Sequence, residues 1–317
     1  MTADRYEAQA AAAMQAVEAR PPDALLWFGR RIAAFELTGA IRARLLEDFS
    51  ATGVPRPSRR AQVAPGNDGG EFARALSQAN GGRGCWQPGW RVAGAGAGND
   101  DESLTVVRPD GLRLLAPAED CRVAGAHADV RLPKELTGFV PGLHIALGDT
   151  PAPEPARALV RLCWTIAATG AAALVARVSY VLNGAGVPFS LQLRADPRRY
   201  ADPGAAGLLL ARTDFAAAMK LVRPLLRTLG PHLADGAPAF AKPLTRGLAV
   251  AEEPPGAEGF AAHRCGLLAD AVVAAGERGL REPAQRLALV RERFAAAGLR
   301  LDAPYLQPGS ADAYELS

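Results

Sequence analysis

Apolar and polar positions alternate most clearly in the middle of the chain, between residues 159 and 210. Leu159–Ile166 mixes β-branched, aromatic and aliphatic residues as a central strand does, and it carries one charged side chain, Arg161. Val187–Ala195 alternates strictly, which predicts a second strand with one apolar and one polar face. The polar face comprises Ser190, Gln192 and Arg194. We expect this face either to line a cleft together with Arg161 or to be an ordinary solvated strand face.

Helical spacing of apolar residues predicts a helix at Ala171–Leu182, ended by a left-handed Asn183-Gly184. The same periodicity predicts seven more helices. They are expected at residues 4–20, 23–35, 41–49, 71–80, 214–229, 259–276 and 282–297. We expect residues 239–246 to form a loop, and residues 304–314 to form an irregular tail anchored by its aromatic side chains.

Short apolar runs separated by turn residues, such as Pro109-Asp110-Gly111, predict a β-meander. Its strands are expected at residues 90–93, 104–107, 112–116, 121–123 and 130–132, with a further strand at 143–147. Because helices and strands alternate unevenly, the pattern favours the α+β class: a mixed, largely antiparallel sheet packed by helices, with a helical N-terminal region. The stretch 53–70 is rich in Pro, Gly, Arg and Asn and reads as a loop or linker. We therefore expect an N-terminal helical region and linker at 1–65 and an α+β domain at 66–317.

Composition and charge argue against nucleic-acid-binding and membrane proteins. Of the 317 residues, 49% are hydrophobic and the net charge is +3, but only three of the 36 basic residues are lysines. This Ala/Arg bias is typical of a GC-rich genome, so abundant arginine says little about function. No Lys/Arg block interleaved with aromatic residues occurs, which argues against nucleic acid. The N-terminus lacks a signal-peptide core, and the longest uncharged apolar run is too short to span a bilayer. We expect a cytoplasmic protein without a membrane partner.

Cofactor motifs are absent from the sequence. The four cysteines, at positions 85, 121, 163 and 265, contain no Cys-x-x-Cys pair, and the four histidines are isolated. This spacing predicts no metal site. The glycines at 81, 82 and 84 are not followed by Lys-Ser/Thr, so they do not form a phosphate-binding loop of the nucleotide-binding type. We expect no cofactor.

Several phrases of the sequence, taken in order, resemble the HopA-type family, first named for a bacterial type III effector. They run from residue 76 to the C-terminus: LSQANGGRGCWQPGW, RLPKELTGFVPGLHIALGD, VRLCWT, LNGAGVPFSLQLRADPRRY, FAKPLTRGLAVAEEP, HRCGLLA and PYLQP. Relatives of this kind occur in the biosynthesis of ribosomally made, modified peptides, including class V lanthipeptides and thioamitides. A more distant likeness is to the phosphothreonine lyases among bacterial effectors.

The resemblance implies a lyase that acts on a precursor peptide. A phosphotransferase-like partner kinase phosphorylates Ser or Thr of that peptide, and the lyase then removes the phosphate by β-elimination to leave a dehydroamino acid. This reaction needs a base for the Cα proton, a general acid for the leaving phosphate, and stabilisation of the developing enolate. Arginine and lysine donors suit the phosphoryl group.

The resemblance assigns these roles to particular residues. Arg161, Lys242 and Arg264 match basic positions of the family and are expected at the phosphate, with Arg246 beside them. His144 is the candidate general acid, and Lys134 is a weaker candidate base. Each of these residues also has a competing, non-functional interpretation. His144 would be a structural histidine, Arg264 would pair with Glu252 or Glu253, and Lys242 would be solvated.

Three departures from the family pattern fall on the same expected cleft. Gln192 stands where relatives have a lysine, the most natural elimination base, and glutamine cannot abstract a proton. Asp202 and Gly204 replace an arginine and an aspartate. Arg194, on the same strand face as Gln192, is expected to restore part of the lost positive charge but is a poor base.

Three functions follow from these matches and departures. The first is a phosphoserine/phosphothreonine lyase with altered active-site residues. The second is a catalytically degenerate relative that binds the precursor peptide, the kinase or both as a scaffold. The third is an effector or chaperone-like interaction protein with no role in peptide maturation.

Overall fold

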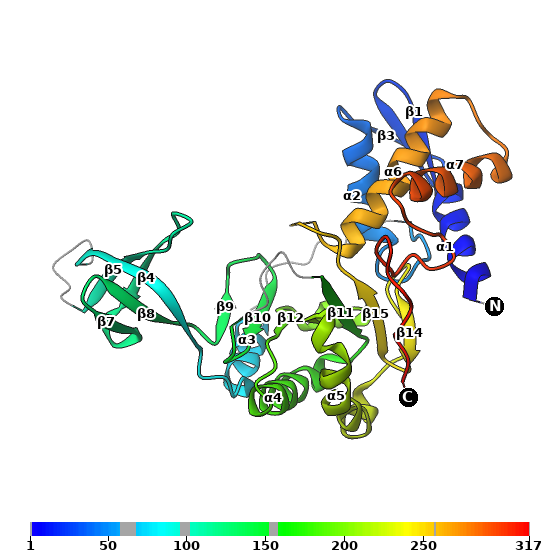
Figure 1. Ribbon diagram of the computed structural model, residues 1–317. Coiled ribbons are helices and arrows are strands. Elements are labelled where there is room, and N and C mark those ends of the chain that lie inside the picture. The colour runs from blue at the N-terminus through cyan, green and yellow to red at the C-terminus, as the bar shows by residue number, and fades with distance from the viewer. Residues whose placement is uncertain (1, 58–67, 96–101, 152–157, 257, 317) are drawn as a thin grey trace.

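A seven-stranded antiparallel sheet forms the centre of the protein, in a computed structural model that describes residues 2–57, 68–95, 102–151, 158–256 and 258–316 (Figure 1). Its strand order is β14-β15-β11-β13-β12-β10-β9. The strands are β9 (Glu135–Thr137), β10 (Leu143–Leu147), β11 (Leu159–Trp164), β12 (Ser190–Arg194), β13 (Ala206–Ala211), β14 (Lys242–Thr245) and β15 (Leu248–Glu252). The α+β class predicted from the sequence is thereby confirmed.

The two faces of this sheet differ in polarity because residues on each strand alternate between them. Leu162 on β11 and Leu191 on β12 are fully buried under helices. Three helices cover this helix face: α3 (Asp68–Ala79), α4 (Ala168–Gly184) and α5 (Phe215–Leu229). The opposite face carries Arg161 and Gln192, whose side chains are hydrogen-bonded to each other at 3.1 Å. The polar strand face predicted from the sequence is therefore shared with Arg161.

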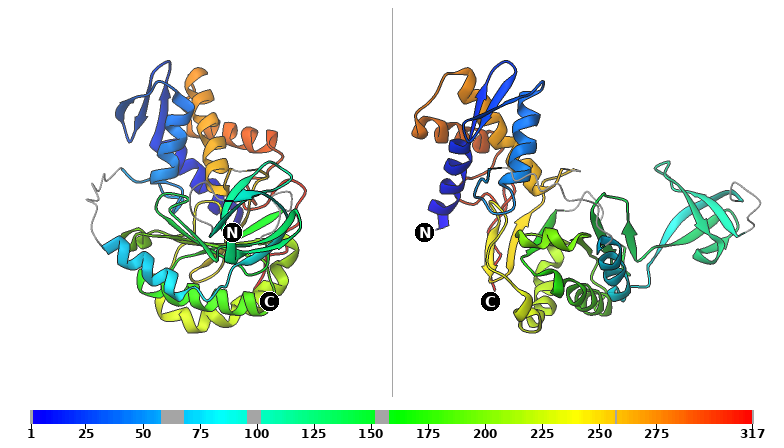
Figure 2. Two further views of the ribbon diagram at one scale, coloured as in Figure 1. Left: turned by 90° about the vertical axis from the view of Figure 1, so that its left-hand side faces the viewer. Right: turned by 180° about the vertical axis from the view of Figure 1, so that it is seen from behind.

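The N-terminal segment packs with the C-terminal helices on the other side of the sheet from α4 and α5 (Figures 1 and 2). Its elements are α1 (Thr2–Ala16), β1 (Val17–Arg20), β2 (Ala24–Trp27), β3 (Arg30–Ala33) and α2 (Leu37–Asp48), and the C-terminal helices are α6 (Phe260–Glu277) and α7 (Pro283–Ala296). One hydrophobic core runs from α1 through the sheet to α7. The boundary predicted between residues 65 and 66 lies outside the described residues, as does most of the predicted linker.

The helix predicted at residues 23–35 is wrong, because this segment forms β2 and β3 of a three-stranded antiparallel sheet. Phe28 and Gly29, between the two strands, both adopt left-handed conformations, with φ of 47° and 77°. Two such residues in succession close a tight hairpin whose twist matches its strands. The turn overrides the helix-like spacing of Leu25, Phe28 and Ile32.

A five-stranded sheet projects from the body as a separate wing, at the left of Figure 1. Its strands are β4 (Cys85–Ala95), β5 (Ser103–Val107), β6 (Arg113–Pro117), β7 (Cys121–Ala124) and β8 (His127–Leu132), in the order β6-β5-β4-β8-β7. They enclose a small core of their own, built from Trp90, Val106, Ala116, Ala128 and Val130. The predicted strands of this region are confirmed, and the Pro109-Asp110-Gly111 turn joins β5 to β6.

Smaller differences from the predictions arise at the ends of elements. Four short 3-10 helices connect larger elements: η1 (Ala118–Asp120), η2 (Pro197–Ala201), η3 (Arg212–Asp214) and η4 (Gly230–His232). The predicted loop at 239–246 contains edge strand β14. Helix α4 continues through Gly184, and the left-handed residue beyond it is Gly186, with φ of 65°. No helix among the described residues is long and apolar enough to span a membrane.

Candidate functional site

A cleft of about 690 Å³ opens on the polar face of the central sheet. Its floor is formed by β11 and β13, and its walls are the C-terminal part of α2, the η2–β13 segment and the N-terminus of α6. Three arginines line it, Arg161, Arg194 and Arg199, and we call it the arginine cleft. Guanidinium groups from β11, β12 and η2 thus converge on one hollow, which the carboxylates of Glu47 and Asp202 also line.

Arg161 is held on the floor of the cleft by two neighbours. Its Nε donates to Glu253, and its Nη1 donates to Gln192. Gly207 on the adjacent strand makes room for the guanidinium, since a Cβ there would lie 2.5 Å from Arg161 Nη1. Cys163, two residues along β11, also lines the cleft, but burial raises the pKa of its thiol to about 12. The floor therefore offers a fixed cation and a neutral thiol.

Arg194 and Arg199 also line the cleft. Arg194 ends β12, and Arg199 lies on η2, which begins where the Asp196 carboxylate accepts from the Arg198 N–H at 3.0 Å. Neither guanidinium makes a hydrogen bond or ion pair with any residue that the structure describes. Burial, and then the positive charge of Arg199, lower the pKa of Arg194, yet an arginine remains charged at neutral pH. These two donors are available to an anion.

Asp202 and Gly204 follow η2 and line the same cleft. Asp202 accepts from Arg56 at 3.0 Å, so its charge is paired with the segment after α2. Gly204 adopts a left-handed φ of 76°, and a Cβ there would lie 2.9 Å from Pro238 Cγ. These two positions, identified from the sequence as altered relative to the family, thus shape the rim of the cleft.

The N-terminus of α6 faces the cleft, where residues 259–262 line it. Glu253 organises this corner, because one carboxylate oxygen accepts from Arg161 and the other accepts from the Phe260 N–H at 2.7 Å. The positive end of the helix dipole favours an anion at this position. Glu253 is buried, and its charge is compensated by the ion pair with Arg161.

The two candidate catalytic residues lie on the opposite face of the sheet. His144 pairs with Leu193 across β10 and β12, and Leu193 belongs to the helix face. Lys134 donates to the carbonyl oxygens of Ser77 and Asn80 at 3.3 and 2.9 Å, at the C-terminus of α3. The structure therefore does not bring them to the cleft, and neither touches Arg161. Strand alternation explains the position of His144, because Ile145, not His144, shares a face with Gln192.

Three of the predicted phosphate ligands also lie outside the cleft. Lys242, on edge strand β14, pairs with Asp312 at 2.6 Å. Arg246, on the turn after β14, lies 3.5 Å from Asp235. Arg264 is buried to 1% exposure and donates to the carbonyl oxygens of Pro304 and Leu306 at 2.8 and 3.0 Å. None of the three lines the cleft, so the expected convergence of Lys242, Arg246 and Arg264 on Arg161 does not occur.

Sequence reasoning missed three residues of the cleft: Arg199, Glu253 and Gly207. Arg199 follows a helix-capping Asp196-Pro197, a signal that could have placed it on a turn directly after β12. Glu253 and Gly207 carry no comparable signal, because their importance comes from strands β13 and β15 lying on either side of β11. Among the described residues, no group of His, Cys, Asp and Glu is arranged to hold a metal ion.

Comparison with known sequences identifies one family. The sequence profile of the HopA1 effector protein family matches residues 138–306. The structure is similar to that of an effector protein from Pseudomonas syringae pv. tomato strain DC3000, with a TM-score of 0.46 and 16% identity over 97% of this chain and 96% of that one. It is also similar to an effector protein from Pseudomonas syringae pv. syringae strain 61, with a TM-score of 0.42 and 15% identity over 86% and 98% of the two chains. The sequence matches no curated protein.

Proposed function

The chain belongs to the HopA1 effector protein family, and from this premise we propose that its arginine cleft binds a phosphoserine or phosphothreonine of a precursor peptide. The peptide would be the product of a phosphotransferase-like kinase in a cytoplasmic pathway for modified peptides. The observation that carries the proposal is the pair of guanidinium groups, Arg194 and Arg199, that line the cleft and make no direct hydrogen bond or ion pair with any described residue, although, against the lowering by burial, the Asp202 charge raises the pKa of Arg194.

A phosphoryl group suits this cleft for three physical reasons. Guanidinium groups bind phosphate oxygens with paired, charge-assisted hydrogen bonds. The N-terminus of α6 lines the same cleft and adds a positive helix dipole, which the Glu253 carboxylate compensates in part. A volume of about 690 Å³ is large enough for a side chain together with the backbone on either side of it. A peptide therefore fits better than a free inorganic ion.

The residues of the cleft support binding better than elimination. β-Elimination requires a base that can remove the weakly acidic Cα proton. No lysine or histidine is among the described residues that line the cleft. Position 192, where relatives have a lysine, is a glutamine whose side chain accepts a hydrogen bond from Arg161. The Cys163 thiol remains protonated, because burial raises its pKa to about 12. We therefore propose a scaffold that holds the phosphorylated peptide, and, with it, the kinase.

The lyase is the second candidate, because position 192, although a glutamine in this chain, lies beside Arg161 in the cleft. The Gln192 amide lies 3.1 Å from Arg161 Nη1, so a lysine at 192 would stand directly beside the bound phosphoryl group. A base at this position would be close to the Cα proton of the same residue. The family resemblance assigns the elimination base to this position.

Binding of a synthetic phosphothreonine peptide tests the proposal. We expect the phosphopeptide to bind and its unphosphorylated form to bind at least about tenfold more weakly, because a charge-assisted contact is worth about 1.5–3 kcal/mol. Arg194→Ala should weaken phosphopeptide binding by about tenfold, whereas Arg246→Ala, the same change outside the cleft, should not. Isothermal titration calorimetry measures both. Equal affinity for the two peptides would refute the proposal.

Mass spectrometry of the same mixtures separates scaffold from lyase. The scaffold predicts an intact phosphopeptide after prolonged incubation, and the lyase predicts the loss of phosphoric acid. In Gln192→Lys, the scaffold interpretation predicts that elimination appears or increases, because the missing base is then supplied next to Arg161. Elimination by the unaltered protein would replace the scaffold with the lyase without disturbing the assignment of the cleft.

A further inference from the structure

The arginine cleft has an apolar surface directly beside Arg194. Leu143, at the start of β10, lines the cleft and lies opposite Arg194 of β12 in the antiparallel pairing. Side chains of residues that lie directly opposite each other project from the same face of a sheet, with their Cβ atoms about 5 Å apart. Val140 also lines the cleft, and its carbonyl accepts from the Leu143 N–H at 3.1 Å, so a tight turn places it next to Leu143.

This apolar surface, formed by Val140 and Leu143, is open to a ligand. Val140 is 38% exposed, and Leu143 is only partly buried. The turn is fixed to the neighbouring segment, because the Ala195 N–H donates to the Gly142 carbonyl at 2.9 Å. A group bound at Arg194 therefore has an apolar neighbour within the same hollow, and the pairing of β10 with β12 holds the two in place.

Two carboxylates line the same cleft, but both are already paired with arginines. Glu47 lies 3.6 Å from Arg44, and Asp202 lies 3.0 Å from Arg56. Because these ion pairs compensate the two negative charges, a basic side chain of a ligand gains little at them. An apolar side chain, in contrast, is stabilised when it and the surface of the cleft shield each other from water. Beside the phosphoryl group, the cleft therefore favours an apolar side chain over a basic one.

We propose that the surface of Val140 and Leu143 holds a large apolar side chain of the phosphopeptide, two residues away from the phosphothreonine or phosphoserine. In an extended peptide, side chains two residues apart point in the same direction, and their Cα atoms lie about 6–7 Å apart. That spacing lets the phosphoryl group reach Arg194 while the apolar side chain contacts Leu143. Adjacent residues point to opposite sides, so they cannot do both. This inference rests on the proposed function and names the class of peptide that the cleft accepts.

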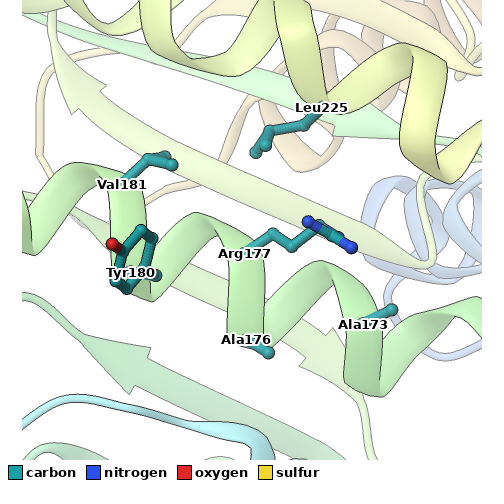
Figure 3. A pocket seen from close by; sticks show the side chains of 6 residues that line it. All are labelled: Ala173, Ala176, Arg177, Tyr180, Val181 and Leu225. Carbon is teal, nitrogen blue, oxygen red and sulfur yellow. The ribbon is translucent and has the colours of Figure 1, made fainter.

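A second apolar hollow, on the helix face of the sheet, supplies a control. It is a groove of about 560 Å³ between α4 and α5, and Val181 and Leu225 line it from the two helices (Figure 3). It shares no residue with the cleft. A leucine that bound to apolar hollows in general would therefore respond to a change at Val181 as well as to one at Val140.

Fluorescence anisotropy with five phosphothreonine peptides and the full-length protein tests the inference. One peptide has glycine at the two positions on each side of the phosphothreonine, and each of the other four has leucine at one of these positions. We expect leucine at one of the two outer positions to tighten binding by about tenfold, because burial removes its apolar area from water. Leucine at either inner position should change the affinity by less than about twofold, because it points away from the surface. Lysine at the favoured outer position should give no gain.

Three variants locate the apolar contact. Val140→Ser should reduce the preference for leucine over glycine to about threefold or less, because it removes methyl groups that contact the leucine. Val181→Ser, the same change in the groove between α4 and α5, should leave the preference unchanged. Arg194→Ala should weaken binding of the leucine and glycine peptides by the same factor, because it acts on the phosphoryl group and not on the apolar side chain.

Four outcomes would overturn the inference. These are no gain from leucine at either outer position, an equal gain at inner and outer positions, a larger gain from lysine than from leucine, or a preference that Val181→Ser reduces as much as Val140→Ser does. Equal binding of the phosphorylated and unphosphorylated glycine peptides would instead refute the proposed function. If phosphorylation strengthens binding and leucine adds nothing, this inference alone fails. Circular dichroism checks that each variant is folded, and the peptide series on the unaltered protein needs no variant.

Discussion

His144 is buried to 1% exposure, and neither ring nitrogen has a hydrogen-bond partner among the residues that the structure describes. Its Nε2 lies 3.7 Å from Glu135 Oε2, too far for a hydrogen bond. Burial lowers the pKa of His144 below its ordinary value of 6.5, and Glu135 opposes this effect only in part. His144 is therefore a neutral part of the packing between β10 and α3, on the face of the sheet opposite the arginine cleft.

The lowered pKa predicts how stability depends on pH. Below about pH 6.5 the unfolded chain binds a proton at this position more readily than the folded chain does. The free energy of unfolding that neutral His144 contributes is therefore fully present above that pH and decreases as the pH falls. His144→Leu should therefore lose less stability than the unaltered protein between about pH 7.5 and pH 5.5. Urea unfolding at both pH values measures the difference. His127→Leu, on the exposed end of β8, is the control, and an unchanged pH dependence in His144→Leu would contradict the prediction.

The wing is joined to the body through one pair of neighbouring strands. Cys85 at the start of β4 pairs with Leu132 at the end of β8, so the chain leaves the body and returns to it at the same place. Gly84 is required at this junction, since its φ is 85° and a Cβ there would collide with the Leu132 carbonyl. The wing core shares no residue with the main core. Such an insertion behaves as a separate unit.

Removal of the wing is expected to leave the body folded. A variant in which a short Gly/Ser loop replaces residues 86–131 should keep the free energy of unfolding of the body within about 1 kcal/mol, because the main core is untouched. Urea unfolding and the affinity for the phosphothreonine peptide measure this. As a contrast, an equally short loop that replaces α3 should unfold the protein, since α3 covers the helix face. Aggregation of the variant without the wing would show that the two cores depend on each other.

At the scale of the whole molecule, the C-terminal tail joins elements that are far apart in the sequence. Tyr305 packs on Tyr6 of α1, and Tyr314 packs on Phe215 at the start of α5. Glu252 of β15 accepts from the Gln307 N–H and the Tyr314 hydroxyl at 2.7 and 2.6 Å. Buried Arg264, whose pKa burial lowers to about 10, remains charged and donates to two tail carbonyls. The tail thus connects the N-terminal elements, α6 and the central sheet.

Truncation of residues 304–317 is expected to destabilise the entire protein by about 3 kcal/mol or more, because it leaves Arg264 and Glu252 buried without these partners. Arg264→Met in the full chain should cost less, since the aromatic contacts of the tail remain. The two changes should be less than additive when combined, because they remove the same contacts. Urea unfolding followed by circular dichroism gives all three values. Strict additivity would show that Arg264 does not act through the tail.

Much of the secondary structure followed from local pattern. The alternation along β12, the apolar run of β11 and the periodicity of α6 and α7 each predicted the correct element, because burial of one face demands that spacing. The errors lie where a backbone turn outweighs side-chain spacing, as at Phe28-Gly29, or where a strand is an edge, as with Lys242–Thr245. Edge strands bury little apolar surface and therefore carry a weak signal.

The sequence by itself determined the α+β class, the family, and the polar strand face that carries Gln192 and Arg194. These depend on neighbours in the chain, whose spacing fixes which side chains share a face. Only the tertiary structure decided which cations meet. It brought Arg161, Arg194 and Arg199 to one cleft, and it paired Lys242 and Arg264 with the C-terminal tail, because β11 pairs with strands that come much later in the chain. A pairing between distant segments is a property of the packed core, and no local spacing encodes it.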